Sequence, residues 1–183
     1  MNRRYFIAVL VSGVAIAGSM RAADQAGAEK TKRPIQAQVV DVVRNESDFE
    51  RTVGNIEVIY EDGTKDHWTT KRDCGLPQVA ANGTVGWVVY KPEVNGPEGE
   101  KNVRVNNTVT ICKKGKVLGH ATTALPFIEE WRFLDGGVHF ATKSRALHGP
   151  ADLEFFDTAT GKRIAETKAY AGNLPEWAKG WSE

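Results

Sequence analysis

The sequence lacks most of the residue patterns that identify a reaction. It has 183 residues with only two cysteines and four histidines, and no two histidines stand at the H-x-H or H-x-x-x-H spacing of metal ligands. The nucleophile motif G-x-S-x-G, the phosphate loop G-x-x-x-x-G-K-[ST] and the calcium loop D-x-[DN]-x-[DN]-G are all missing. These absences argue against the common hydrolase, nucleotide and calcium chemistries, and we expect neither a metal ion nor a cofactor.

An excess of positive charge is missing as well. The chain has 24 Lys and Arg against 23 Asp and Glu, a formal net charge of +1. Removal of residues 1–23 would take away Arg3, Arg4 and Arg21, which leaves 21 basic against 23 acidic residues and a charge of −2. Proteins that bind nucleic acid usually carry a basic patch or a high pI. Nucleic acid is therefore not an expected partner.

A hydrophobic run occurs only near the start of the sequence. Arg3 and Arg4 precede the mostly apolar segment Tyr5–Ala17, and small residues follow it as far as Ala23. This is the pattern of a secretory signal peptide, and the run is shorter than the ~20 apolar residues that span a bilayer. We predict a signal peptide over 1–23, no membrane span after its cleavage, and a periplasmic or secreted protein. An uncleaved anchor is the alternative.

The remaining length fits one domain. Residues 24–34 are polar and charged and end in a proline, which predicts a flexible leader before a single β domain over 35–183. Residues 36–43 are apolar enough for a first strand, and a short helical turn around Asp48 is equally compatible with the sequence nearby.

Glycine-containing turns recur between β-rich segments from residue 55 onward. Asp-Gly, Asn-Gly and Gly-Gly pairs favour hairpins because these turns need positive φ angles. Their flanks are rich in Val, Ile, Thr and aromatic residues, which suit strands. The sequence therefore predicts an all-β fold of antiparallel hairpins, with turns at 61–63, 81–83, 113–115, 135–137 and 158–161.

Some of these segments are apolar on both faces. Residues 86–90 (GWVVY) and 153–156 (LEFF) place large side chains at successive positions, whereas a sheet with one wet face would alternate. We therefore expect sheets that are covered on both sides.

Three segments resemble β-propeller blades of the TolB type, which are WD40-like. Segments 77–87 (PQVAANGTVGW) and 131–138 (WRFLDGGV) are similar to the blade opening P-x-W-S-P-D-G-x-x-I-A-F, and 153–162 (LEFFDTATGK) is similar to the closing hairpin L-x-L-W-D-x-x-T-G-K. The serine-proline of the opening is absent from both units. The resemblance covers about residues 55–167 and implies a propeller-blade-like partial stack of about two and a half blades, against about four to eight in closed propellers.

A partial stack leaves a sheet face uncovered at each end. The strand at 36–43 and the tail 174–181 are the candidates to cover these faces. Pro175 suits the first turn of a short helix, and Trp177 and Trp181 stand four residues apart on one face of it. We expect this short C-terminal helical turn to pack on the last sheet. A homodimer is the alternative cover.

Cys74 and Cys112 form an even pair in a protein predicted to be exported. Such a pair predicts a disulfide, which would close a loop of about 38 residues and contribute about 4 kcal/mol in the chain-entropy model. Two separate buried thiols are the alternative.

The candidate site residues are few and weak. His148 lies four residues before Asp152 in a loop between two predicted strands, where a His–Asp pair can carry out acid–base chemistry if the side chains converge. Glu129 and Glu130 should point to opposite faces of one strand, so only Glu130 joins the catalytic candidates, with Arg132 or Lys143 as its structural partner. Trp131, His148, Asn95 and Glu98 are the binding candidates, the last two in the polar excursion 92–102.

These features favour a non-catalytic, exported binding or scaffolding module of β-propeller-like type. Its expected partner is a protein or a glycan of the cell envelope. The alternatives are a periplasmic hydrolase-like enzyme that uses the His148 loop, and a structural accessory of an envelope complex. Blade repeats of the resembled type serve binding, scaffolding and hydrolase roles alike.

Overall fold

The computed structural model describes residues 32–43, 52–91 and 104–181. They belong to one compact unit, Thr31–Glu183. The predicted signal peptide, the predicted turn around Asp48, and the binding candidates Asn95 and Glu98 lie outside the described residues. Within the described ranges, no helix has the length and apolar character needed to cross a membrane.

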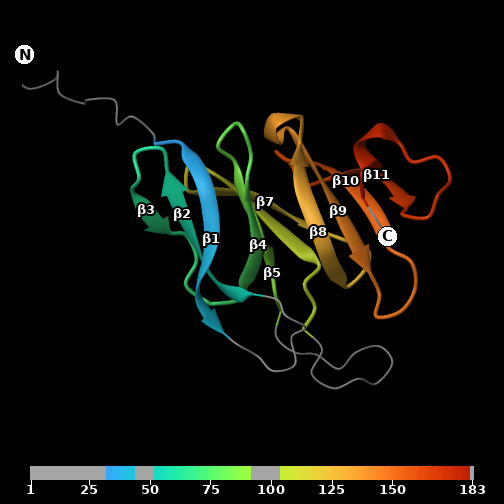
Figure 1. The fold of residues 1–183 in the computed structure, drawn as a ribbon, viewed down its shortest axis with the longest axis horizontal. Coiled ribbons are helices and arrows are strands. Elements are labelled where there is room, and N and C mark those ends of the chain that lie inside the picture. The colour runs from blue at the N-terminus through green and yellow to red at the C-terminus, as the bar shows by residue number, and fades with distance from the viewer. Residues whose placement is uncertain (1–31, 44–51, 92–103, 182–183) are drawn as a thin grey trace, which may run out of the picture. The chain divides into compact units, whose positions relative to one another are not determined.

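Antiparallel strands make up most of the secondary structure of the described chain, as the sequence predicts (Figure 1). One sheet has seven strands in the order β1-β2-β4-β5-β6-β7, with β3 paired to β2, and a second has four in the order β11-β10-β9-β8. The elements are β1 (Pro34–Val43), β2 (Val53–Tyr60), β3 (Lys65–His67), β4 (Cys74–Val79), β5 (Val85–Val89), β6 (Thr108–Lys113), β7 (Lys116–Thr122), β8 (Phe127–Leu134), β9 (His139–Arg145), β10 (Asp152–Asp157), β11 (Arg163–Lys168), and the 3-10 turns η1 (Asp135–Gly137) and η2 (Glu176–Ala178).

All five predicted hairpin turns are confirmed. Each joins two consecutive strands that pair antiparallel, from β2–β3 to β10–β11. A glycine in every one of these turns has positive φ, from 66° at Gly136 to 102° at Gly137. The first strand is confirmed as well, although it begins at Pro34 rather than at residue 36.

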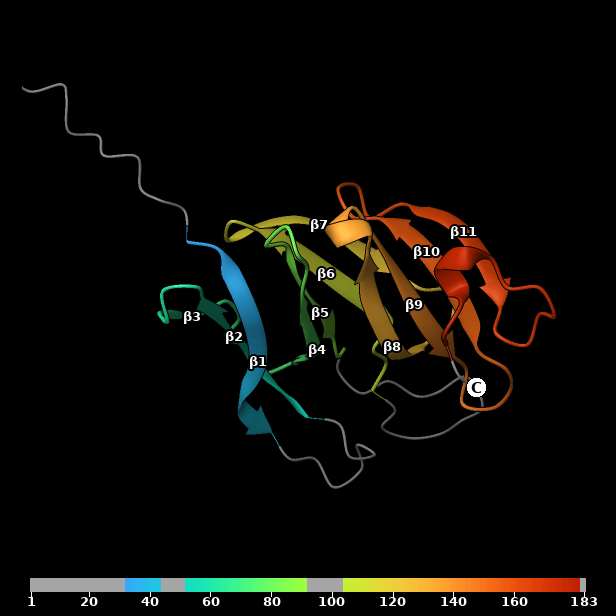
Figure 2. The same ribbon diagram turned by 45° about the horizontal axis from the view of Figure 1, so that its top comes forward.

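The seven-stranded sheet divides into two layers. β2 and β4 pair only at Gly54 and Cys74, and β2 then places Ile56 and Val58 against Trp87 of β5 in one buried cluster. We call β1–β3 the first layer, β4–β7 the middle layer and β8–β11 the last layer. Figure 2 shows the strands following one another in this order.

The middle layer is buried on both faces. In β5, Val85 and Trp87 pack toward the first layer, whereas Val88 packs toward the last layer. The same holds in the last layer, where Leu153 and Phe156 of β10 belong to clusters on opposite faces. The prediction from residues 86–90 and 153–156 is thereby confirmed.

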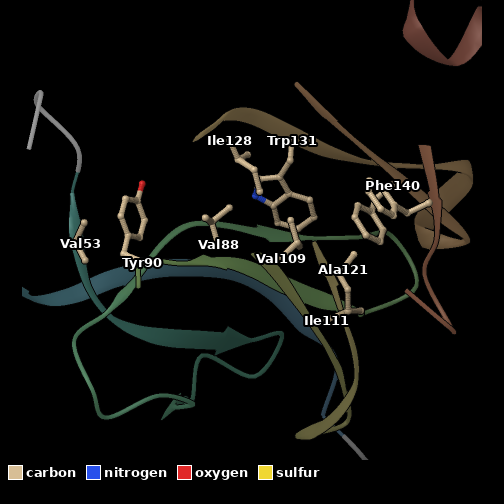
Figure 3. Packing of buried hydrophobic residues seen from close by; sticks show 10 residues of the cluster. Val53, Val88, Tyr90, Val109, Ile111, Ala121, Ile128, Trp131 and Phe140 are labelled. Carbon is tan, nitrogen blue, oxygen red and sulfur yellow. The ribbon is translucent and has the colours of Figure 1, made fainter. Parts of the chain in front are cut away.

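Trp131 is the central contact between the middle and last layers (Figure 3). Its indole Nε1 donates a hydrogen bond of 2.7 Å to the carbonyl of Leu76, and Gln78 Nε2 donates one of 2.9 Å to the carbonyl of Trp131. Leu76 lies in a bulge of β4 with φ of 50°, a conformation that costs energy for a residue with a Cβ atom. The bulge thus aims the Leu76 carbonyl at the indole.

The far face of the last layer is covered by the tail of the chain, as expected. Trp181 and Ala178 join the buried cluster on this face, and Trp177 stacks on Phe155 at 5.2 Å between ring centroids. Arg132 of β8 lies 4.5 Å over the Trp181 ring and donates a hydrogen bond of 2.7 Å to the carbonyl of Lys179. The helical part of this tail is the single 3-10 turn η2.

The outer face of the first layer carries a polar cluster around Glu57. Glu57 of β2 accepts hydrogen bonds from Gln38 of β1 at 2.7 Å and from Lys65 of β3 at 3.0 Å, and His67 lies 3.5 Å away. A polar face needs no further cover. The cover of the last layer thus comes from the tail of the chain, and the homodimer stays a prediction.

The predicted Cys74–Cys112 disulfide is wrong, and the alternative of two buried thiols holds. Cys74 pairs with Val89 and Cys112 pairs with Val85, so the cysteines flank β5 at its two ends. Two strand spacings and four residues along the strand separate their Cα atoms by roughly 16 Å, against about 4.4–6.8 Å in a disulfide. The even count could not reveal this separation, because it depends on the register of three strands.

We predict that Gly86→Ala destabilises the protein. A Cβ atom at Gly86 would lie 2.7 Å from Trp131 Cη2 and 2.9 Å from Ile111 Cδ1, so the layers would have to move apart. The expected loss is about 1–3 kcal/mol in the free energy of unfolding, measured by urea denaturation. Gly172→Ala is the matched control, since a Cβ there meets nothing within 4 Å, and it should change stability by less than about 0.5 kcal/mol. Equal stability of the two variants would contradict this packing.

We predict that neither thiol reacts in the folded protein. Burial raises the pKa of Cys74 to about 12 and that of Cys112 to about 11, so almost no thiolate forms near pH 8. A thiol-specific chromogenic reagent should therefore detect no thiol in the native protein and both thiols after unfolding in guanidinium. An intact mass two hydrogens lower than the reduced chain would contradict the structure.

Candidate functional site

The structure does not bring His148 and Asp152 together. Both carboxylate oxygens of Asp152 accept hydrogen bonds from Lys168 Nζ, at 2.7 and 2.8 Å. His148 is exposed in the β9–β10 loop, and no hydrogen bond or ion pair joins it to Asp152 among the described residues. The geometry of an acid–base pair is therefore absent between these two side chains.

Two further candidates occupy different environments on β8. Trp131 is 3% exposed and lies in the core between two layers, so its indole is not accessible to a ligand at the surface. Glu130 is exposed on the same strand. Arg132, expected as a partner of Glu130, instead contacts Trp181 and Lys179 in the tail.

The β9–β10 loop nevertheless forms one wall of a pocket. The pocket has a volume of about 350 Å³, within the usual range for small-molecule sites. Its lining consists of two cationic residues at the end of β9, three residues of the loop and one tyrosine that follows β11: Lys143, Arg145, Gly149, Pro150, Ala151 and Tyr170. We call this the β9 pocket.

Strand β9 positions the two cations. Side chains two residues apart on a strand lie on the same face, so Lys143 and Arg145 follow Ala141 on the tail side of the last layer. Lys143 is 3% exposed and Arg145 is partly exposed. The other face of β9 holds Phe140 in the core, which fixes the strand beneath the pocket.

A bulge in β8 supplies the counter-charge. Ile128 pairs with Ser144 and Glu130 pairs with Lys143, so Glu129 is an extra residue in the strand. Its carboxylate lies 3.8 Å from Lys143 Nζ and 2.5 Å from Arg145 Nε. The prediction that Glu129 and Glu130 face opposite sides is therefore wrong, because the bulge interrupts the alternation on which it rests.

The Lys143 ammonium and the Arg145 guanidinium stand together at the β9 pocket, and the Glu129 carboxylate lies against both. The Arg145 side chain is 40% exposed, so an anion in the pocket can reach its guanidinium. A guanidinium offers a fork of hydrogen-bond donors that matches carboxylate and phosphate oxygens. The rest of the lining comes from Pro150, Ala151, Gly149 and Tyr170. This arrangement can hold an anion, and its described lining contains no histidine, serine, cysteine or carboxylate to act on one.

Metal ligands do not gather at the pocket or elsewhere in the described ranges. Among residues 32–43, 52–91 and 104–181, no three His, Cys, Asp or Glu side chains lie close enough together to hold an ion.

A second buried charge, Glu154 of β10, serves the fold. It is fully buried and accepts hydrogen bonds from Arg163 Nη1 at 2.6 Å, from the Ala124 amide at 3.1 Å and from Ser144 Oγ at 3.4 Å. These donors come from β11, from the loop before β8 and from β9. Glu154 thus ties three segments together rather than facing a ligand.

Sequence reasoning found the loop of the pocket and named Lys143 as a partner for a glutamate of β8, but it missed Arg145 and did not place either cation at a site. The signal was the alternation Lys143-Ser144-Arg145 within a predicted strand, which places two cations on one face. Tyr170 had no such signal, because its position depends on the turn after β11.

Comparisons with known proteins do not assign the chain. No known protein family matches it, and no curated protein has a similar sequence. The similarity to TolB-type blades therefore stays a prediction.

We predict that Glu154→Ala destabilises the protein far more than Glu166→Ala. Both carboxylates contact Arg163, at 2.6 and 2.9 Å, but only Glu154 is buried. Its loss leaves the Ala124 amide without its acceptor and opens a cavity, for an expected cost of about 2–4 kcal/mol. Glu166→Ala removes an exposed ion pair and should cost less than about 1 kcal/mol. Urea denaturation of both variants provides the measurement, and similar losses would contradict the role given to Glu154.

Proposed function

We propose that the chain is an exported, non-catalytic binding module that holds an anionic ligand in the β9 pocket. The observation that carries this proposal is the partly exposed guanidinium of Arg145, beside the Lys143 ammonium, in the lining of a pocket of about 350 Å³. Export rests on the signal-like pattern of residues 1–23.

The pocket has the features of a binding site more than those of a catalytic one. Catalysis of acyl or glycosyl transfer needs a nucleophile or an acid–base pair within reach of the bound substrate. The described residues offer neither at this pocket, since Lys168 holds Asp152 and His148 stands apart from it. Rigid strands that present loops and charged side chains suit recognition of a ligand instead.

The fold supports a site that is formed before the ligand arrives. Lys143 and Arg145 sit on a strand whose opposite face is packed in the core, and Glu129 holds both cations in place. A preformed site loses little side-chain entropy on binding. The β9 pocket therefore combines two cationic side chains on a packed strand with a loop that lines the space for a ligand.

We predict that Arg145→Gln abolishes most of the anion binding. Calorimetric titrations of the purified protein with acetate, benzoate and inorganic phosphate at low salt should show saturable binding of at least one of these anions. Loss of a charged hydrogen-bond donor should weaken that binding roughly 10- to 100-fold. Lys116→Gln is the charge-matched control, because Lys116 is exposed on β7 and does not line the pocket. Absence of binding by all three anions, or equal affinities of the wild type and Arg145→Gln, would refute the proposal.

A further inference from the structure

We infer that the β6–β7 hairpin docks on the surface of an anionic phospholipid bilayer. Its three lysines, Lys113, Lys114 and Lys116, contact the lipid headgroups, and Val117 and Leu118 enter the interface between headgroups and acyl chains. The inference goes beyond the proposed anion binding and uses none of the residues that line the β9 pocket.

The positive charge of this hairpin has no counter-charge within the described chain. Residues 108–122, which form β6, β7 and the turn between them, contain three lysines and no Asp or Glu. Among the described residues, no ion pair joins any of the three to a carboxylate, whereas Lys65 and Lys168 elsewhere each hold one. The neighbouring β4–β5 turn, residues 80–84, is uncharged. The three ammonium groups are thus available to an anionic surface.

The hairpin holds these lysines at positions that cost stability. Lys113 and Lys116 lie directly opposite each other in the ladder, where like charges repel. Between them, Lys114 and Gly115 have φ of 50° and 71°. A two-residue turn with positive φ at both positions favours Asn, Asp or Gly at the first of them. The stability of the turn therefore does not account for the lysines, and an anionic surface would relieve their repulsion.

Two exposed aliphatic side chains follow the lysines on β7. Val117 is 55% exposed and Leu118 is 42% exposed. Leu118 is an extra residue in the strand, because the register with β6 shifts by one between the pairs that flank it. A bulge bends an edge strand and interrupts its ladder, so β7 is a poor template for a strand added by a peptide or by a second copy of the chain. Its exposed aliphatic pair needs a different partner.

An anionic bilayer matches both features of the hairpin. A soluble polyanion such as a nucleic acid would pair with the lysines and leave Val117 and Leu118 in water. At a bilayer, each lysine near the anionic headgroups strengthens binding about fivefold, and each aliphatic side chain that leaves water adds roughly tenfold. Charge complementarity and the adjacent apolar pair therefore select a lipid surface.

The hairpin turn and the β9 pocket lie at opposite ends of the stack. The β6–β7 turn stands beside the β4–β5 turn, because Cys112 pairs with Val85 (Figure 2). The β4–β5 turn in its turn contacts the β8–β9 turn, where the Asn82 amide donates a hydrogen bond of 3.2 Å to the Gly136 carbonyl. Strand β9 runs from that turn to the pocket at its other end. A molecule docked through the hairpin therefore keeps the β9 pocket away from the lipid.

Flotation of residues 24–183 with lipid vesicles tests the inference. This segment includes the whole compact unit, which begins at Thr31, and lacks the apolar run that would itself insert into lipid. At low salt it should bind phosphatidylglycerol vesicles at least about tenfold more tightly than phosphatidylcholine vesicles. Salt at about 1 M, which shortens the Debye length to about 3 Å, should release most of the bound protein. Absence of binding, or equal binding to the two lipids, would overturn the inference.

The variant Lys114→Asn separates lipid binding from folding. Asn suits the positive φ of the turn, so this variant should unfold at the same temperature as the wild type or higher, and yet bind phosphatidylglycerol vesicles about fivefold more weakly. Lys71→Gln is the matched control and should leave binding unchanged. Lys71 is exposed, forms no ion pair among the described residues, and precedes β4 at the end opposite to its turn. Equal losses in the two variants, or none in Lys114→Asn, would contradict docking through the hairpin.

A last variant distinguishes a bilayer from a soluble polyanion. Leu118 is exposed, so Leu118→Ser should keep the fold, which thermal unfolding checks, while vesicle binding weakens roughly 5- to 10-fold. A single-stranded oligonucleotide should bind the wild type more weakly than the vesicles do. Tighter binding of the oligonucleotide, or vesicle binding that Leu118→Ser leaves intact, would assign the lysines to a polyanion and refute the lipid surface.

Discussion

The contact of Trp131 with the middle layer is the constraint on which the other layers depend. Gly86 leaves room for the indole, and the bulge at Leu76 turns a carbonyl toward it. On the opposite face of the middle layer, Trp87 packs against the first layer. The middle layer is therefore held in position on both of its faces. Three layers in one short chain are thus held by two tryptophans that pack on opposite faces of the middle layer, Trp87 from β5 and Trp131 from β8. The strained backbone at Leu76 persists because its carbonyl completes the contact with Trp131.

The outer faces at the two ends of the stack differ in character. The first layer ends the stack with a polar face centred on Glu57, whose partners come from both neighbouring strands. The last layer has an apolar outer face, which the tail covers with Trp177 and Trp181. Its edge strand β8 is also protected, since Asn106 Nδ2 donates a hydrogen bond of 2.9 Å to the carbonyl of Ile128. A stack of sheets can therefore have both of its outer faces formed by segments of the same chain.

Local chemistry explains which parts of this fold could be predicted from the sequence. The five turns could be predicted because each needs a glycine between two apolar runs. The burial of both faces of a sheet could be predicted because it depends on side chains within five residues of one another. The disulfide prediction was wrong because the distance between Cys74 and Cys112 depends on which strands lie between them. The prediction of the strand face on which Glu129 lies was wrong for a related reason. Ile128 and Trp131 are three residues apart and still share the core, which only a bulge allows, and the sequence carries no clear mark of it.

The bulge also explains why the pocket stands where it does. Phe127 lies opposite Arg145 and Glu130 lies opposite Lys143, and the extra residue Glu129 places one carboxylate beside both cations. On the same face, the tail covers Ala141, whereas Tyr170 stands at its start beside the cations. The tail thus buries the apolar part of the face, and of the two cations beside it Arg145 is partly exposed whereas Lys143 is buried. The bulge residue Glu129 thus fixes two cationic side chains at the boundary between the surface that the tail covers and the surface that it leaves open.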